Sequence, residues 1–109
     1  MEVELLWWAG CPSADEAIEL VREEMRTAGL EPDRLEVREI VDDAGAQRER
    51  FIGSPTIRVD GRDLQEPGDE PLGLTCRVYR LRDGRISALP DRQDIAAALA
   101  AAEGSGRKR

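Results

Sequence analysis

The 109-residue chain contains no histidine and only two cysteines. The lack of histidine excludes the Ser-His-Asp and Cys-His pairs that activate nucleophiles in many enzymes. It also excludes zinc sites built on imidazole, and two cysteines alone do not complete a four-ligand structural zinc site. We therefore expect no metal site and no cofactor, and any covalent chemistry has to come from a thiol without a histidine base.

Long apolar runs are also missing. No stretch of about 18 apolar residues is present, so no membrane span and no membrane partner are expected. The start, "MEVELL", has no basic region followed by an apolar stretch, so the sequence predicts no signal peptide and a cytoplasmic location. A permanent disulfide is disfavoured in that compartment, and cysteines there are more often free or redox-active.

Positive charge is scarcer than negative charge, and the net charge is −7. An acidic chain repels phosphate backbones, so nucleic acid is not an expected partner. The length predicts a single domain. We expect this domain to cover residues 1–104 and residues 105–109 to form a disordered tail.

Apolar periodicity and turn signals predict alternating strands and helices. The expected elements are a strand at 3–8, a helix at 13–28 with a capping box of Ser13 and Glu16, a strand at 34–41, a helix at 42–51, a strand at 55–61, a turn at Asp60–Gly61, a loop at 62–73, a strand at 74–81, a turn at Asp83–Gly84 and a helix from Pro90 to Gly104. The order β-α-β-α-β-β-α predicts an α/β fold with a mixed β-sheet flanked by helices.

Cys11 comes directly after the first predicted strand and before the first helix. Free N–H groups at a helix N-terminus stabilise a thiolate, and Pro12 suits the first turn because its missing N–H costs nothing there. Asp15 and Glu16 oppose the thiolate, so we expect a pKa for Cys11 that is lowered but not extreme. The alternative is a buried cysteine that packs as a small apolar residue, and composition does not choose between the two.

The stretch "FIGSPT" places Pro55 at the start of a predicted strand, where its missing N–H is tolerated. Together with "LLWWAGCPSA", the stretch "AQRERFIGSPTIRVDG" resembles the thioredoxin fold over about residues 3–61. In that family a cis-proline faces the active cysteine, and the preceding residue pairs with the substrate's backbone. The resemblance therefore implies that Pro55 faces Cys11 and that Ser54 offers backbone groups to a partner chain. Ala14 stands where the resolving cysteine belongs, which excludes exchange within a Cys-x-x-Cys motif.

Cys76 is a candidate second thiol, because an antiparallel return after Asp60–Gly61 brings the chain back toward Cys11. The alternative is a core residue on a strand that shares its buried face with Val78, and Arg77 and Arg80 are expected in solvent. The pattern "GCP…GSPT…VDGRD…CRVYR" also resembles small bacterial thioredoxin-family proteins, some of them labelled as relatives of alkylmercury lyases. That resemblance implies contact of a soft metal ion or an organomercurial with the two thiols.

The favoured hypothesis is a thiol-dependent thioredoxin-like protein that performs thiol–disulfide exchange or redox sensing. Cys11 and Cys76 are its candidate catalytic residues. The candidate substrate-binding residues are Trp8, Pro12, Ser13, Ser54 and Pro55. The expected partner is a protein or small-molecule thiol or disulfide, or a soft metal ion. The alternatives are a thiol-based carrier of a soft metal or organomercurial, and a non-catalytic binding module with an inert Cys11.

Overall fold

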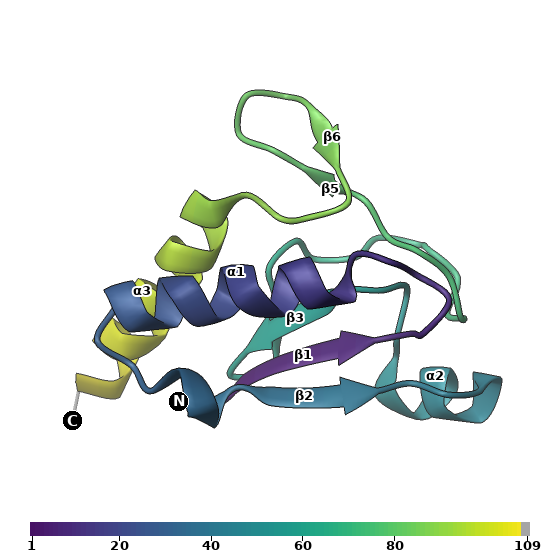
Figure 1. The fold of residues 1–109 in the computed structure, drawn as a ribbon, viewed down its shortest axis with the longest axis horizontal. Coiled ribbons are helices and arrows are strands. Elements are labelled where there is room, and N and C mark those ends of the chain that lie inside the picture. The colour runs from purple at the N-terminus through teal and green to yellow at the C-terminus, as the bar shows by residue number, and fades with distance from the viewer. Residues whose placement is uncertain (108–109) are drawn as a thin grey trace.

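The computed structural model describes residues 1–107 and has an α/β fold, with a mixed four-stranded sheet, a separate hairpin and three helices (Figure 1). The elements are β1 (Val3–Trp7), α1 (Ala14–Thr27), the 3₁₀ turn η1 (Pro32–Arg34), β2 (Glu36–Glu39), α2 (Asp43–Glu49), β3 (Thr56–Val59), β4 (Arg62–Asp63), β5 (Tyr79–Arg80), β6 (Ile86–Ser87) and α3 (Arg92–Arg107). Within the described residues, no helix is long and apolar enough to cross a membrane.

The sheet has the strand order β2-β1-β3-β4, with β1 parallel to β2 and antiparallel to β3. Asp60 and Gly61 both have positive φ, at 50° and 81°, as the predicted tight turn between β3 and β4 requires. Because β1 and β3 run in opposite directions, the end of β1 and the start of β3 lie at the same end of the sheet, with Leu6 opposite Thr56. Both stretches that carry the predicted site therefore meet there.

Alternation along the strands divides the core between the two faces of the sheet. Val3 and Leu5 belong to a cluster with residues of α1 and α3, whereas Leu6 belongs to a second cluster near α2. Trp7 packs against the first cluster and Trp8 against the second. The tryptophan pair therefore straddles the sheet.

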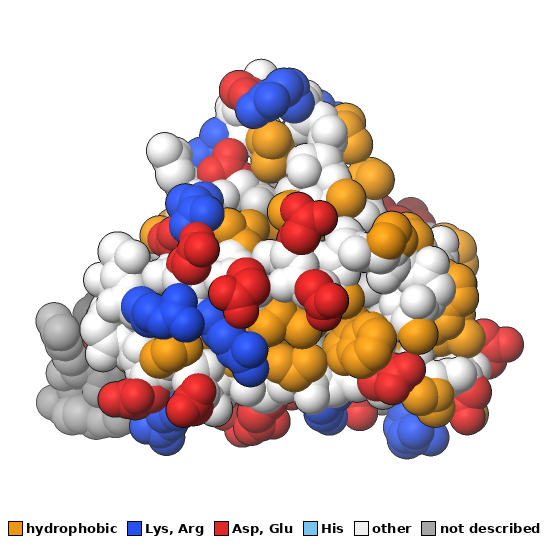
Figure 2. All heavy atoms as spheres, in the orientation of Figure 1, with side chains coloured by type: hydrophobic (Ala, Val, Ile, Leu, Met, Phe, Trp, Pro, Cys, Tyr) orange, Lys and Arg blue, Asp and Glu red, His pale blue; other side chains and the backbone are white. Residues whose placement is uncertain are grey.

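Acidic side chains gather over α1 in Figure 2. Four of them are exposed, namely Asp15, Glu16, Glu19 and Glu23. Glu24 is the exception, because it is buried and accepts a 2.7 Å hydrogen bond from Arg92 of α3. This ion pair joins the two helices that cover one face of the sheet.

The second half of the chain departs from the prediction. Of the strand expected at 74–81, only Tyr79–Arg80 is a strand, and it pairs with β6 across the predicted turn at Asp83–Gly84. The fourth strand of the sheet is instead β4, because the tight turn after β3 leads straight back along it. The predicted helix end at Gly104 is wrong, since α3 continues to Arg107. Glycine costs a helix about 1 kcal/mol but does not by itself end it. Residues 108–109 of the expected tail lie outside the described residues.

Candidate functional site

The loop between β1 and α1 carries Cys11 and is held tightly at the end of the sheet. The Cys11 N–H donates to the Trp8 carbonyl at 3.1 Å, which closes a turn. A Cβ atom at Gly10 would overlap the indole of Trp8, so only glycine lets the loop cross this ring. Trp8 therefore supports the loop from the core side. Its backbone N–H also donates to Ser54 Oγ at 3.0 Å, which ties the loop to the start of β3.

Cys11 is 6% exposed, yet its sulfur has polar neighbours. Cys11 Sγ lies 3.4 Å from Ser13 Oγ and 3.5 Å from the Ser54 carbonyl oxygen, to which the protonated thiol donates. Ser13 makes no side-chain hydrogen bond to the end of α1, so the predicted capping box is wrong. Its hydroxyl faces the sulfur instead. Pro12, between the two, is exposed.

Ser54 and Pro55 are fully buried at the start of β3, and the peptide bond between them is cis. The Ser54 N–H donates to the carbonyl of Thr75 at 2.8 Å, and the Ser54 carbonyl accepts from the N–H of Arg77 at 2.9 Å. These two bonds form a parallel bridge that sets Cys76 opposite Ser54. The backbone groups that the family resemblance had assigned to a partner chain are thus occupied by the protein's own segment 75–77.

Gly53 allows this segment to come close. A Cβ atom there would lie 2.8 Å from Arg77 Cβ and 3.2 Å from its backbone nitrogen, and the φ of Gly53 is +154°. A side chain at this position would push segment 75–77 away from β3. This role of Gly53 is not among the predictions from the sequence, in which its place directly before Ser54–Pro55 is the local signal.

Arg77 anchors the same segment inside the protein. Its guanidinium donates to both carboxylate oxygens of Asp63, at 2.8 and 2.7 Å, and to the carbonyl of Gln65 at 2.8 Å. It also lies 4.5 Å from the centre of the Tyr79 ring. The side chains of Arg77 and Asp63 are only 6% and 8% exposed, so the expectation that Arg77 is solvated is wrong. A buried, doubly hydrogen-bonded pair of this kind holds its segment in one position.

Along residues 76–79, the side chains that face inward are therefore the opposite set from the one that the apolar pattern predicts. Arg77 and Tyr79 face inward, whereas Cys76 is exposed and Val78 is 63% exposed. The alternative that placed Cys76 and Val78 on a core face is wrong, because the charge of Arg77 is satisfied inside by Asp63. Arg80 is exposed, as expected.

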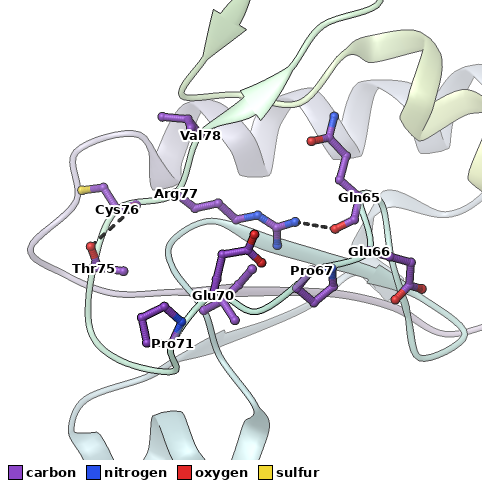
Figure 3. Close-up of a pocket in the computed structure, with 10 residues that line it drawn as sticks. Gln65, Glu66, Pro67, Glu70, Pro71, Thr75, Cys76, Arg77 and Val78 are labelled. Carbon is purple, nitrogen blue, oxygen red and sulfur yellow. Dashed lines mark hydrogen bonds between the residues drawn. The ribbon is translucent and has the colours of Figure 1, made fainter.

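The two thiols act on each other's ionisation. Burial opposes the charged form of Cys11, but interaction with the nearby Cys76 thiol and with Ser13 and Ser54 outweighs burial and lowers the pKa of Cys11. The hydrogen bond to Cys11, burial and the negative charge on Cys11 all raise the pKa of Cys76. The directions of the two pKa shifts make Cys11 the more acidic thiol of the pair. Figure 3 shows the sulfur of Cys76 directed toward the loop between β1 and α1.

These contacts define a two-thiol site at one end of the sheet in an α/β protein. Both cysteines are free. Within residues 1–107, no three or more His, Cys, Asp or Glu side chains are grouped so as to hold a metal ion. Comparison of the chain with protein-family models, with curated proteins and with solved structures finds no match.

Proposed function

We propose that this protein has a thioredoxin-like domain and performs thiol–disulfide exchange through Cys11 and Cys76. The observation that carries the proposal is that both cysteines meet at Ser54. Cys11 Sγ lies 3.5 Å from the Ser54 carbonyl oxygen, and Cys76 pairs with Ser54 across a parallel bridge. Bridged residues lie about 4.8 Å apart, so the two thiols share one small neighbourhood.

The order of elements supports the thioredoxin-like assignment. A parallel β1-α1-β2 unit is followed by α2, by an antiparallel β3-β4 pair and by a C-terminal helix, in the sheet order β2-β1-β3-β4. Cys11 precedes α1 by one turn, which matches the position of the reactive cysteine in the family that the sequence resembles. The second thiol comes from segment 75–77 rather than from α1, where Ala14 stands.

The two cysteine sulfurs are sufficient to balance the atoms and electrons of the exchange reaction. One cysteine attacks a partner disulfide, forms a mixed disulfide and releases the first partner thiolate; the other cysteine then attacks the mixed disulfide and releases the second. Two electrons pass from the cysteines to the partner, which becomes two thiols, and the protein retains a Cys11–Cys76 disulfide. The proton of Cys76 and one proton from water go to the released thiolates. The reverse sequence oxidises a partner dithiol.

Intact mass after reaction with excess hydroxyethyl disulfide tests this proposal. The native wild-type chain is expected to lose two hydrogen atoms and to carry no adduct, because the second cysteine expels the reagent. The C11S and C76S variants are each expected to stop at one stable adduct. A wild-type chain that accumulates two adducts under native conditions, or that closes its disulfide no faster in denaturant-free buffer than when unfolded, contradicts the proposal.

A second candidate function is the capture of a soft metal ion between the same two thiols. No third ligand groups with the two thiols among the residues that the structure describes, and two thiolates suit a soft ion that accepts linear coordination. Titration with Hg(II) distinguishes the two functions. A carrier protects both thiols at one equivalent and closes no disulfide with hydroxyethyl disulfide, whereas an exchange protein closes the disulfide readily.

A further inference from the structure

A cleft of about 370 Å³ opens beside Cys76, between segment 75–78 and the loop 65–71 (Figure 3). Its apolar walls are Ile52, Pro67, Pro71 and Val78. Cys76 lines the cleft, and Cys11 is not among the lining residues. The cleft thus borders one thiol of the pair and is large enough for a small thiol or for one side chain of a partner chain.

The carboxylates of the cleft make it negative. Glu66 and Glu70 line it and are both exposed. Arg77, which also lines the cleft, pairs with Asp63 at 2.7 Å and also interacts electrostatically with Glu70. Its single positive charge is outnumbered by the carboxylates of Asp63, Glu66 and Glu70, so the cleft remains negative. The net charge of −7 on the whole chain adds to the same sign. A cationic molecule is therefore attracted to this cleft, and an anionic one is repelled.

Exposure and geometry both select Cys76 as the sulfur that meets the partner. Cys76 is exposed, whereas Cys11 is 6% exposed. The Cys76 sulfur is directed toward the loop that carries Cys11, and the cleft lies on the other side of Cys76 (Figure 3). A thiolate that attacks a disulfide approaches in line with the bond it breaks. An incoming sulfur on the cleft side is thus placed to attack Cys76 and to expel Cys11, whose departing thiolate is still stabilised by Ser13 and Ser54.

We propose that this cleft is the docking site for the exchange partner, that Cys76 carries the mixed disulfide, and that the preferred partner is a thiol or disulfide with a positive charge next to the sulfur. The inference rests on the proposed exchange function and adds its substrate class. In the reducing direction, Cys76 passes its proton to Cys11 and attacks the partner disulfide. The first partner thiolate leaves and takes that proton from Cys11. The Cys11 thiolate then attacks the Cys76 sulfur and releases the second partner thiolate, which takes a proton from water.

Three small disulfides of different charge test the substrate class. Cystamine carries two ammonium groups, hydroxyethyl disulfide is neutral, and dithiodiglycolate carries two carboxylates. Each rate of oxidation of the native chain is divided by the rate of the same reagent with a small neutral thiol, which removes intrinsic differences in reactivity. We expect cystamine to be about fivefold faster than the neutral reagent on this scale, and dithiodiglycolate about fivefold slower, at low salt.

The E66Q/E70Q variant identifies the source of this preference. It is expected to bring the normalised rates of the three reagents within about twofold of one another, since it removes both carboxylates that line the cleft. The matched control, E19Q/E23Q, removes the same charge from the exposed face of α1 and is expected to retain the preference. Equal normalised rates in the wild type, or the same loss of preference in both variants, overturns the inference while exchange itself continues. Failure of all three reagents to close the disulfide instead overturns the proposed function.

The single-cysteine variants test which sulfur meets the partner. In alkaline buffer, where both thiols ionise, C11S is expected to form its cystamine adduct at least about tenfold faster than C76S, because Cys11 is covered. Circular dichroism is the check that both variants remain folded. Adduct formation on C76S at the rate of C11S or faster contradicts the assignment of Cys76.

Discussion

Ser54 and Cys76 lie opposite each other in a parallel bridge that is closed by the chain itself. Both backbone groups of Ser54 are bonded to the residues that flank Cys76. The same Ser54 carbonyl lies 3.5 Å from Cys11 Sγ. The backbone of Ser54 thus binds the protein's own segment 75–77 and brings the thiol of Cys76 close to that of Cys11. Helix α1 supplies no second thiol, because Ala14 stands at the corresponding position.

Substitutions at Cys76 should change the pKa of Cys11 according to whether a donor remains. C76A removes the hydrogen bond that lowers the pKa of Cys11, so this pKa is expected to rise. C76S keeps a hydroxyl donor and is expected to retain most of the effect. The measurement is the pH dependence of iodoacetamide alkylation of Cys11 in the two variants. Superimposable profiles contradict the hydrogen bond between the two side chains.

The lowered pKa of Cys11 also predicts how stability depends on pH. Because the folded pKa of Cys11 lies below its unfolded value, the thiolate stabilises the folded state above the unfolded pKa of about 8.5, and this contribution is lost as pH falls through the folded pKa. The difference in the free energy of unfolding between C76S, which keeps Cys11, and C11S/C76S, which lacks it, is therefore expected to shift in favour of C76S as pH rises through this window. Urea unfolding at a series of pH values measures the difference, and a decrease contradicts the prediction.

Loss of Asp63 should destabilise the fold by leaving a buried charge unpaired. D63N is expected to cost about 3 kcal/mol in the free energy of unfolding, because Arg77 remains buried without its carboxylate. D83N is the control, since it breaks the highly exposed Asp83–Arg85 pair and is expected to leave the unfolding midpoint almost unchanged. D63N should also slow closure of the Cys11–Cys76 disulfide, because Arg77 holds the segment of Cys76.

A side chain at Gly53 should separate Cys76 from Cys11. G53A is expected to cost about 2 kcal/mol, because the new methyl group meets Arg77 and the backbone has a positive φ. G73A is the control, since nothing lies within 4 Å of a Cβ atom there. Chemical denaturation gives the stabilities, and intact mass gives the rate of disulfide closure. Equal behaviour of the two variants contradicts the close approach at Gly53.

The hydroxyl of Ser13 should affect the pKa of Cys11 more than it affects the stability of α1. S13A is expected to raise the pKa of Cys11 and to cost less stability than the loss of a helix cap, because Ser13 caps no N–H group. D42A is the comparison, since Asp42 accepts a 2.8 Å hydrogen bond from the Gly45 N–H and its loss is expected to cost about 1 kcal/mol. A larger loss of stability in S13A than in D42A contradicts this distinction.

Local signals predicted the first half of the fold well. The helix expected at 13–28 is observed at Ala14–Thr27, and the turn expected at Asp60–Gly61 joins β3 to β4. Each of these features depends on residues that are neighbours in the chain, such as apolar residues at helical spacing or the Asp-Gly pair of a tight turn. In the stretch 62–81, residues 62–73 have no such regularity, and the alternation of 74–81 predicted the wrong buried face. Which side chains of this stretch are buried depends on the ion pair between Asp63 and Arg77, two residues that are not neighbours in the chain.

The sequence by itself determined the α/β order of the elements, the position of Cys11 at the start of α1 and the absence of a histidine base, because these follow from composition and from neighbouring residues. The sequence left open whether Cys76 is a second thiol near Cys11 or a core residue, and only the tertiary structure placed Cys76 opposite Ser54 and turned Arg77 inward. Both outcomes depend on the bridge at Ser54 and on the buried pair with Asp63. These contacts join segments that are distant in the chain, and the local pattern of one segment does not indicate its partner. The free energy that favours the contacts arises only when the segments pack together.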